Sequence, residues 1–105
     1  MEKDAKNTTL DYVLNNGNTV KLTLTFGKLN VLKSVNNQLY EKFNKIVNGK
    51  SDEILDLVTI IYVAYWCANF GKDGILTESE FIDLVPFDLL DIKKVFTTLT
   101  QPKKK

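Results

Sequence analysis

Hydrophobic and polar residues alternate along residues 10–26, and this period of two predicts two β-strands. The Asn16-Gly17 pair between them is typical of a type I′ turn, which places two successive residues at positive φ, so the strands should form a β-hairpin. A lone hairpin is only marginally stable in water, so its apolar face is expected to pack against helices. That face carries Leu10, Tyr12 and Leu14 from the first strand and Val20, Leu22, Leu24 and Phe26 from the second.

The hydrophobic period changes after Gly27. From Leu29 to Ile46 apolar residues recur every three or four positions, which predicts one amphipathic helix over 29–47 that ends at Asn48-Gly49. A second helix should begin with Ser51 or Asp52 as its N-cap. Its last 14 residues, Leu57 to Phe70, are apolar almost all round. Because roughly 20 residues are needed to cross a membrane, this segment is predicted to be a central core helix.

Two shorter helices are predicted in the last third of the chain. Thr77 and Glu80 have the spacing of a capping box, so a third helix should begin near residue 78. Pro86 should end it, and Asp88 should cap a fourth helix. The expected fold is α+β, an N-terminal β-hairpin packed on a small bundle of about four helices with an apolar central helix. Its expected parts are a flexible N-terminus over 1–9, one globular domain over 10–100 and a basic tail over 101–105.

The composition narrows the choice of partners. Hydrophobic residues make up 44% and charged residues 26% of the 105 positions, as in globular proteins. All 14 basic residues are lysine and the net charge is +1, so the guanidinium contacts typical of nucleic-acid recognition are missing. Residues 1–9 are polar, which argues against a signal segment, and a single Cys67 cannot form an internal disulfide. We expect an intracellular protein that binds neither nucleic acid nor membrane.

Catalytic motifs are also missing. The chain has no histidine, which excludes Ser-His and Cys-His nucleophile pairs, and its five glycines form no phosphate-binding loop. The acidic clusters at 52–56, 78–83 and 88–91 fall in predicted first helical turns, where they serve as caps and dipole partners. We therefore expect no enzyme activity and no cofactor, and a function based on binding another macromolecule.

One segment resembles a calcium-binding loop. With Gly74 at the sharp turn of an EF-hand loop, Asp73 and Glu80 occupy ligand positions. Asn69 and Gly71 stand where stronger ligands are expected, so the loop is degenerate and the same residues also read as a turn plus a capping box. A small calcium-binding module remains an alternative function, with Asp73 and Glu80 as its ligands.

Four segments after the hairpin share a hydrophobic pattern with a known family. They read Gly27-Lys28-Leu29-Asn30-Val31-Leu32, Leu39-Tyr40-Glu41-Lys42-Phe43, Ile61-Tyr62-Val63-Ala64-Tyr65-Trp66-Cys67-Ala68-Asn69 and Glu80-Phe81-Ile82-Asp83-Leu84. The third contains a Tyr-x-Ala-Tyr-x-Cys-Ala-Asn stretch, and a Glu-Phe helix follows it. In this order, together with the hairpin, they resemble the tail assembly chaperones of long-tailed (siphovirus-type) bacteriophages of Gram-positive bacteria, and the resemblance covers residues 10–100.

The resemblance implies a non-enzymatic protein of the infected host's cytoplasm that is absent from the mature virion. Proteins of that family coat the helical tape measure protein, keep it soluble and help recruit tail tube subunits. The resemblance also implies association between copies of the chain. Chaperones of this kind are often made in two lengths by frameshifting, and the codons of Lys103–Lys105 are a candidate slippery run. A general adaptor protein with another partner is the remaining alternative.

Bulky aromatic residues are the candidates for contact with the partner, because such residues anchor protein interfaces. A helix-in-groove mode suits a tape measure protein that exposes long apolar stripes. For Trp66 and Phe70 the alternative is that the hairpin or the last helix covers them as part of the core. The candidates are Tyr40, Tyr62, Trp66, Phe70 and Phe87.

Overall fold

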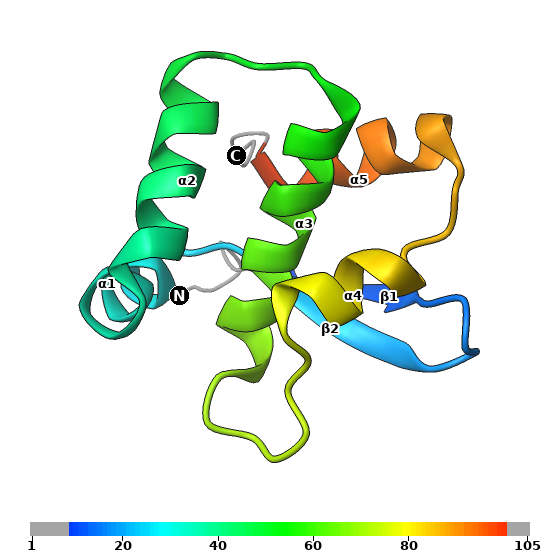
Figure 1. The fold of residues 1–105 in the computed structure, drawn as a ribbon, viewed down its shortest axis with the longest axis horizontal. Coiled ribbons are helices and arrows are strands. Elements are labelled where there is room, and N and C mark those ends of the chain that lie inside the picture. The colour runs from blue at the N-terminus through cyan, green and yellow to red at the C-terminus, as the bar shows by residue number, and fades with distance from the viewer. Residues whose placement is uncertain (1–8, 101–105) are drawn as a thin grey trace, which may run out of the picture.

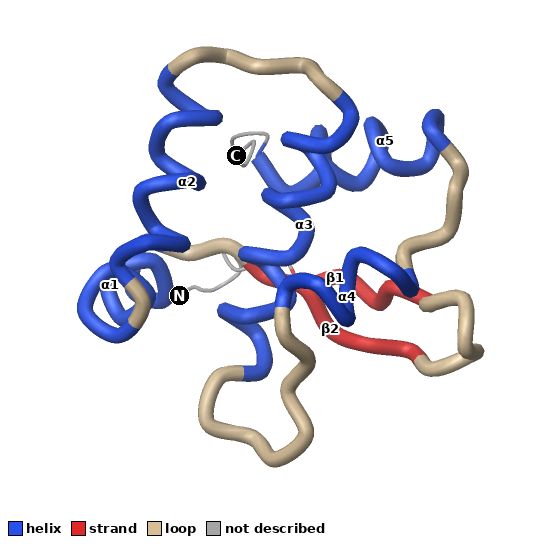
Figure 2. The backbone as a smooth tube through the Cα atoms, in the orientation of Figure 1, coloured by secondary structure: helices blue, strands red, loops and turns tan. Residues whose placement is uncertain are grey.

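The computed structural model describes residues 9–100, and Figure 1 shows their arrangement. The predicted flexible N-terminus, apart from Thr9, and the predicted basic tail lie outside the described residues. Two strands, β1 (Thr9–Val13) and β2 (Thr19–Thr23), form an antiparallel hairpin. Five helices follow, and α3 lies at their centre with the hairpin and the other helices around it (Figures 1 and 2). The predicted α+β fold is confirmed.

The predicted apolar face of the hairpin is the buried one. Tyr12, Leu14 and Leu22 are buried, while Asp11 and Lys21 form an ion pair across the opposite face. The prediction was wrong for Phe26, which does not continue the strand but begins the first helix and is exposed.

The hairpin turn is not the predicted type I′ turn. Among residues 15–18 only Gly17 has positive φ, at 87°, whereas a type I′ turn needs two such residues. The Gly17 N–H donates to the Leu14 carbonyl (2.9 Å), and the Leu14 N–H donates to the Asn18 carbonyl (2.8 Å). This is a three-residue loop that ends in a left-handed glycine. The backbone N–H of Asn15 donates to the Leu84 carbonyl (2.8 Å), so the loop is also tied to a later helix.

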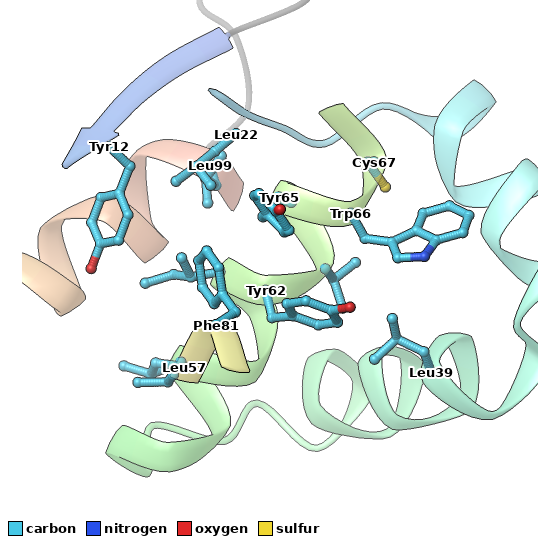
Figure 3. Close-up of a cluster of buried hydrophobic side chains, with 14 of the residues drawn as sticks. Tyr12, Leu22, Leu39, Leu57, Tyr62, Tyr65, Trp66, Cys67, Phe81 and Leu99 are labelled. Carbon is cyan, nitrogen blue, oxygen red and sulfur yellow. The ribbon is translucent and has the colours of Figure 1, made fainter. Parts of the chain in front are cut away.

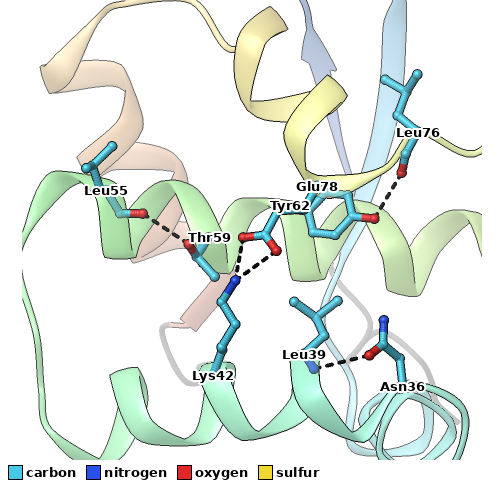
Figure 4. Close-up of polar contacts among 8 residues, drawn as sticks. All are labelled: Asn36, Leu39, Lys42, Leu55, Thr59, Tyr62, Leu76 and Glu78. Atoms are coloured by element: carbon cyan, nitrogen blue, oxygen red, sulfur yellow. Dashed lines mark hydrogen bonds and ion pairs between the residues drawn. The ribbon is translucent and has the colours of Figure 1, made fainter.

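The single helix predicted over 29–47 is two helices, α1 (Phe26–Val35) and α2 (Asn37–Asn48). Asn36 separates them with φ −140° and ψ 76°, outside the helical region. Its side-chain oxygen accepts the Leu39 N–H at 3.2 Å and so caps α2 (Figure 4). An asparagine side chain can compete in this way with the helical backbone, which explains the break.

Helix α3 (Ile54–Asn69) is the core helix that its composition predicts, because every residue from Leu57 to Cys67 is buried. Its N-cap is Glu53 rather than Ser51 or Asp52. Ser51 instead accepts the Glu53 N–H (3.2 Å) and donates to the Asp56 carboxylate (2.6 Å), so it stabilises the first turn from two positions before the N-cap.

Helices α4 (Glu78–Leu84) and α5 (Leu89–Thr100) complete the fold. The predicted capping box is present, since Thr77 accepts the Glu80 N–H (3.2 Å) and Glu80 accepts the Thr77 N–H (2.9 Å). The Asp88 carboxylate accepts the Asp91 N–H (3.1 Å), as predicted for a cap of α5. Within residues 9–100 there is no helix of the length and apolar character needed to span a membrane.

Candidate partner-binding surfaces

Tyr62 and Tyr65 lie inside the protein, against Phe81 of α4 (Figure 3). The ring centroid of Phe81 is 4.8 Å from that of Tyr65 and 5.5 Å from that of Tyr62. All three rings are buried, and Phe81 has no exposed surface. The structure therefore places Tyr62, a candidate contact residue, in the core with 6% of its surface exposed.

The two tyrosine hydroxyls hold the backbone of Leu76, which precedes α4. The Tyr62 hydroxyl donates to the Leu76 carbonyl (2.9 Å; Figure 4), and the Leu76 N–H donates to the Tyr65 hydroxyl (2.8 Å). Burial raises the pKa of Tyr62 to about 12, with a smaller contribution from the carboxylate of Glu78. These bonds tie the loop over 70–77 to α3, so both tyrosines have a structural role.

Trp66 and Phe70 form a stacked pair at the end of α3, with ring centroids 4.6 Å apart. Trp66 is 7% exposed, and Figure 3 shows it directed towards the side of α1 and α2, away from α5. Phe70 keeps 46% of its surface exposed. The structure thus covers Trp66 as a core residue, while one face of Phe70 stays accessible.

Tyr40 and Phe87 lie at the surface. Tyr40 is half-buried on α2, its ring centroid is 6.3 Å from that of Phe43, and the ammonium of Lys33 lies 5.6 Å above the ring. Phe87, in the connection between α4 and α5, is 91% exposed. Of the five aromatic candidates, these two line apolar hollows of the surface.

Two adjoining hollows of about 430 Å³ and about 390 Å³ together form a surface groove, here called the α1–α2 groove. Phe26, Leu29, Phe43 and Val47 line both parts. Phe26 stands beside the groove with 91% of its surface exposed. The remaining lining residues are Leu24, Thr25 and Thr100 in the first part and Asn30, Lys33, Tyr40 and Asn44 in the second.

Tyr40 is the one candidate that lines the groove, and Phe26 is the most exposed of the groove residues that the sequence did not indicate. The alternating pattern assigned it to the inward face of the second strand, whereas α1 begins at Phe26 itself. The Thr25 hydroxyl accepts the Lys28 N–H (3.2 Å) and caps this helix. A threonine that immediately precedes the change to helical period was the local signal that could have placed the helix start correctly.

A second apolar surface, here called the Phe87 patch, surrounds a hollow of about 120 Å³ between the start of α3 and the α4–α5 connection. It shares no lining residue with the α1–α2 groove. Figure 1 shows α1 and α2 on one side of α3 and the α4–α5 connection on the other. The exposed residues that line this hollow are Leu55, Phe87 and Leu89.

Charge is divided unequally between these surfaces. Residues 24–50, which contain α1 and α2, carry five lysines and one glutamate. Residues 51–100 carry nine acidic and three basic residues, and Asp52, Glu53, Asp88 and Asp91 of this set flank the Phe87 patch in sequence. The groove is therefore on a basic part of the chain and the Phe87 patch on an acidic part.

The degenerate calcium loop shows no ligand cluster. Glu80 accepts the Thr77 N–H within the capping box (2.9 Å), and Gly71 and Gly74 adopt positive φ of 92° and 80° as turn residues. Nowhere in the described part of the chain do three or more histidine, cysteine or acidic side chains gather into a metal-binding group. Asp73 and Glu80 thus lie in a turn followed by a capped helix.

No family model, curated protein or solved structure matches this chain. The two exposed apolar surfaces and the resemblance of the segments described above are therefore the features that indicate a function.

Proposed function

We propose that this chain is a bacteriophage tail assembly chaperone that binds amphipathic helices of the tape measure protein in the α1–α2 groove. The observation that carries the proposal is the open apolar groove with Phe26 exposed beside it. Apolar surface of this kind is unfavourable in water unless a partner covers it, and it commonly marks an interaction site. A helix that presents apolar side chains at positions i, i+3 or i+4 and i+7 can place them along such a groove.

A shallow groove suits reversible binding to a long partner. Burying one phenylalanine contributes about 1.5–3 kcal/mol, so a single groove gives modest affinity. A tape measure protein repeats its apolar stripe over many helical turns, and many copies of the chaperone can cover it side by side. The complex acts in the cytoplasm of the infected bacterium, and the chaperone is absent from the mature virion because tube subunits replace it.

The Phe87 patch is the proposed contact for the tail tube subunit. It is a separate apolar surface with a different charge around it, so one copy of the chain can hold the tape measure helix and a tube subunit together. Recruitment of tube subunits requires this simultaneous contact.

The test uses two matched phenylalanines. Phe26 and Phe87 are both 91% exposed, so replacing either by alanine removes the same side chain without disturbing the core. The chain is co-expressed with a fragment of the tape measure protein encoded in the same gene cluster, and the soluble fraction of the fragment is measured. We expect the natural chain and Phe87→Ala to keep the fragment soluble, and Phe26→Ala to lose this effect.

A pull-down with the tail tube protein should give the opposite pattern, with binding lost in Phe87→Ala and retained in Phe26→Ala. Thermal unfolding of both variants should match that of the natural chain. A tape measure fragment that is equally insoluble with and without the natural chain would refute the chaperone function.

A further inference from the structure

We infer that the α1–α2 groove selects helices whose apolar stripe is flanked by aspartate or glutamate. This inference deepens the proposed function, since it takes a helix as the occupant and adds the charge that the helix must carry. Two sets of charged residues indicate this preference, those at the α1–α2 groove and those beside the Phe87 patch.

The groove offers a cation and no anion. Lys33 is the one charged residue among the residues that line its two parts. The Lys33 ammonium lies 5.6 Å above the centroid of the Tyr40 ring, and this cation–π contact holds it at the side of the groove. A carboxylate at the edge of a docked helix would meet this ammonium, whereas a lysine there would be repelled.

The other charged residues of α1 and α2 lie outside the groove lining. Lys28 and Lys50 are exposed on α1 and just after α2, and within residues 9–100 neither forms an ion pair with a carboxylate. Glu78 neutralises Lys42 at 2.9 Å.

Lys45 lines a separate hollow together with Asp56, and Glu41 is an exposed carboxylate on α2. Lys33 is thus the charge at the groove itself, and within residues 9–100 no carboxylate forms an ion pair with it.

The Phe87 patch gives the opposite preference. Glu53 precedes Leu55 of the patch, and Asp88 and Asp91 follow Phe87 in the chain. An acidic helix would be repelled from this patch and attracted to the groove. Charge therefore distinguishes two apolar surfaces that apolar contact alone would not separate.

The experiment compares two synthetic helical peptides with the same leucine and phenylalanine stripe. One has glutamate and the other has lysine at the positions beside the stripe. Binding to the full chain is measured by fluorescence anisotropy at low and at physiological salt. One exposed ion pair changes affinity by about two- to fivefold, so we expect the glutamate peptide to bind at least that much more tightly than the lysine peptide. The ratio should shrink as salt screens the charges.

Charge-reversal variants locate the effect. Lys33→Glu should bring the ratio of the two affinities close to one or invert it. Lys72→Glu changes the net charge equally but lies in the exposed loop after α3, so it should leave the ratio almost unchanged. Phe26→Ala should lower the affinity for both peptides by a similar factor. Circular dichroism should show that all three variants fold, since each replaced side chain is exposed.

Equal affinity for the two peptides would overturn the inference, and so would an effect of Lys72→Glu as large as that of Lys33→Glu. Sedimentation provides a further check, because self-association that Phe26→Ala abolishes would make a second copy the occupant and also overturn it. The inference and the chaperone function can fail separately. A charge preference that depends on Lys33, together with a tape measure fragment that stays insoluble, would support the inference and refute the function.

Discussion

Removing single hydroxyl groups from the four tyrosines tests whether the contacts at Leu76 stabilise the fold. The change from tyrosine to phenylalanine keeps the ring and removes one polar atom. Tyr62 and Tyr65 each bond the Leu76 backbone, at 2.9 Å and 2.8 Å. The Tyr12 hydroxyl is buried and has no hydrogen-bond partner among the described residues, and Tyr40 is half-buried on α2. The same chemical change thus meets three different environments.

The expected losses follow from what each hydroxyl leaves behind. Tyr65→Phe leaves the Leu76 N–H without its partner, and an unsatisfied donor costs about 1–3 kcal/mol. Tyr62→Phe removes a donor to the Leu76 carbonyl, which corresponds to an ordinary hydrogen bond of about 0.5–1.5 kcal/mol. Tyr12→Phe removes a buried polar atom that gains no bond on folding, so it should be neutral or stabilising. Tyr40→Phe should change the free energy of unfolding by less than about 0.5 kcal/mol.

Urea denaturation and thermal unfolding measure these differences. For a domain of this size a loss of 1 kcal/mol lowers Tm by roughly 4–8 °C, so the two larger effects are easily resolved. For the Tyr62→Phe, Tyr65→Phe double variant, the loss in free energy of unfolding should differ from the sum of the two single losses, because both hydroxyls bond the same residue. The m-value should stay constant throughout the series.

The order of the four variants can refute the reasoning. If Tyr12→Phe destabilised the protein more than Tyr65→Phe did, the Tyr12 hydroxyl would have to be well bonded and the Leu76 contacts would contribute little. If Tyr62→Phe and Tyr65→Phe each lowered the free energy of unfolding by less than about 0.3 kcal/mol, the two hydrogen bonds to Leu76 would not be what holds the loop against α3.

Three further predictions concern ionisation and the backbone. Burial raises the pKa of Cys67 from 9.0 to about 12 and those of Tyr12 and Tyr62 from 10.0 to about 12, so the folded state binds these protons more tightly. The free energy of unfolding should therefore be constant below pH 9 and fall as the pH rises towards 12. In Cys67→Ala the urea midpoint should begin to fall only at the higher pH at which the tyrosines ionise. Gly17→Ala should cost about 1 kcal/mol in thermal unfolding, because its φ of 87° is strained for alanine while the space around it is open. Asn36→Ala should remove about 1 kcal/mol with its cap of α2, and unchanged stability would show that the break between α1 and α2 does not need this side chain.

The elements that the sequence identified were those with strong local signals. A period of two gave the hairpin, and an all-apolar stretch gave α3 as the central helix. The capping box at Thr77 and the cap at Asp88 were found because each is made by residues only three positions apart. The break at Asn36 was also local, but the amphipathic period on both sides of it concealed the competing cap.

The sequence predicted only some of the residues that form the candidate surfaces. Aromatic character singled out Tyr40 and Phe87, which lie at exposed hollows, together with Tyr62 and Trp66, which the fold buries. Nothing in a residue's type tells these two outcomes apart. Phe26 was assigned to the interior because it continued a strand pattern, yet it stands 91% exposed beside the groove.

By itself the sequence determined which segments form strands and helices, because hydrogen bonding and side-chain periodicity act between residues close in the chain. Only the tertiary structure decided which aromatic rings are covered and where the groove lies. Residues from Leu24 to Thr100 meet to form that groove. Exposure is a property of the packed molecule, since it depends on what the distant parts of the chain leave uncovered.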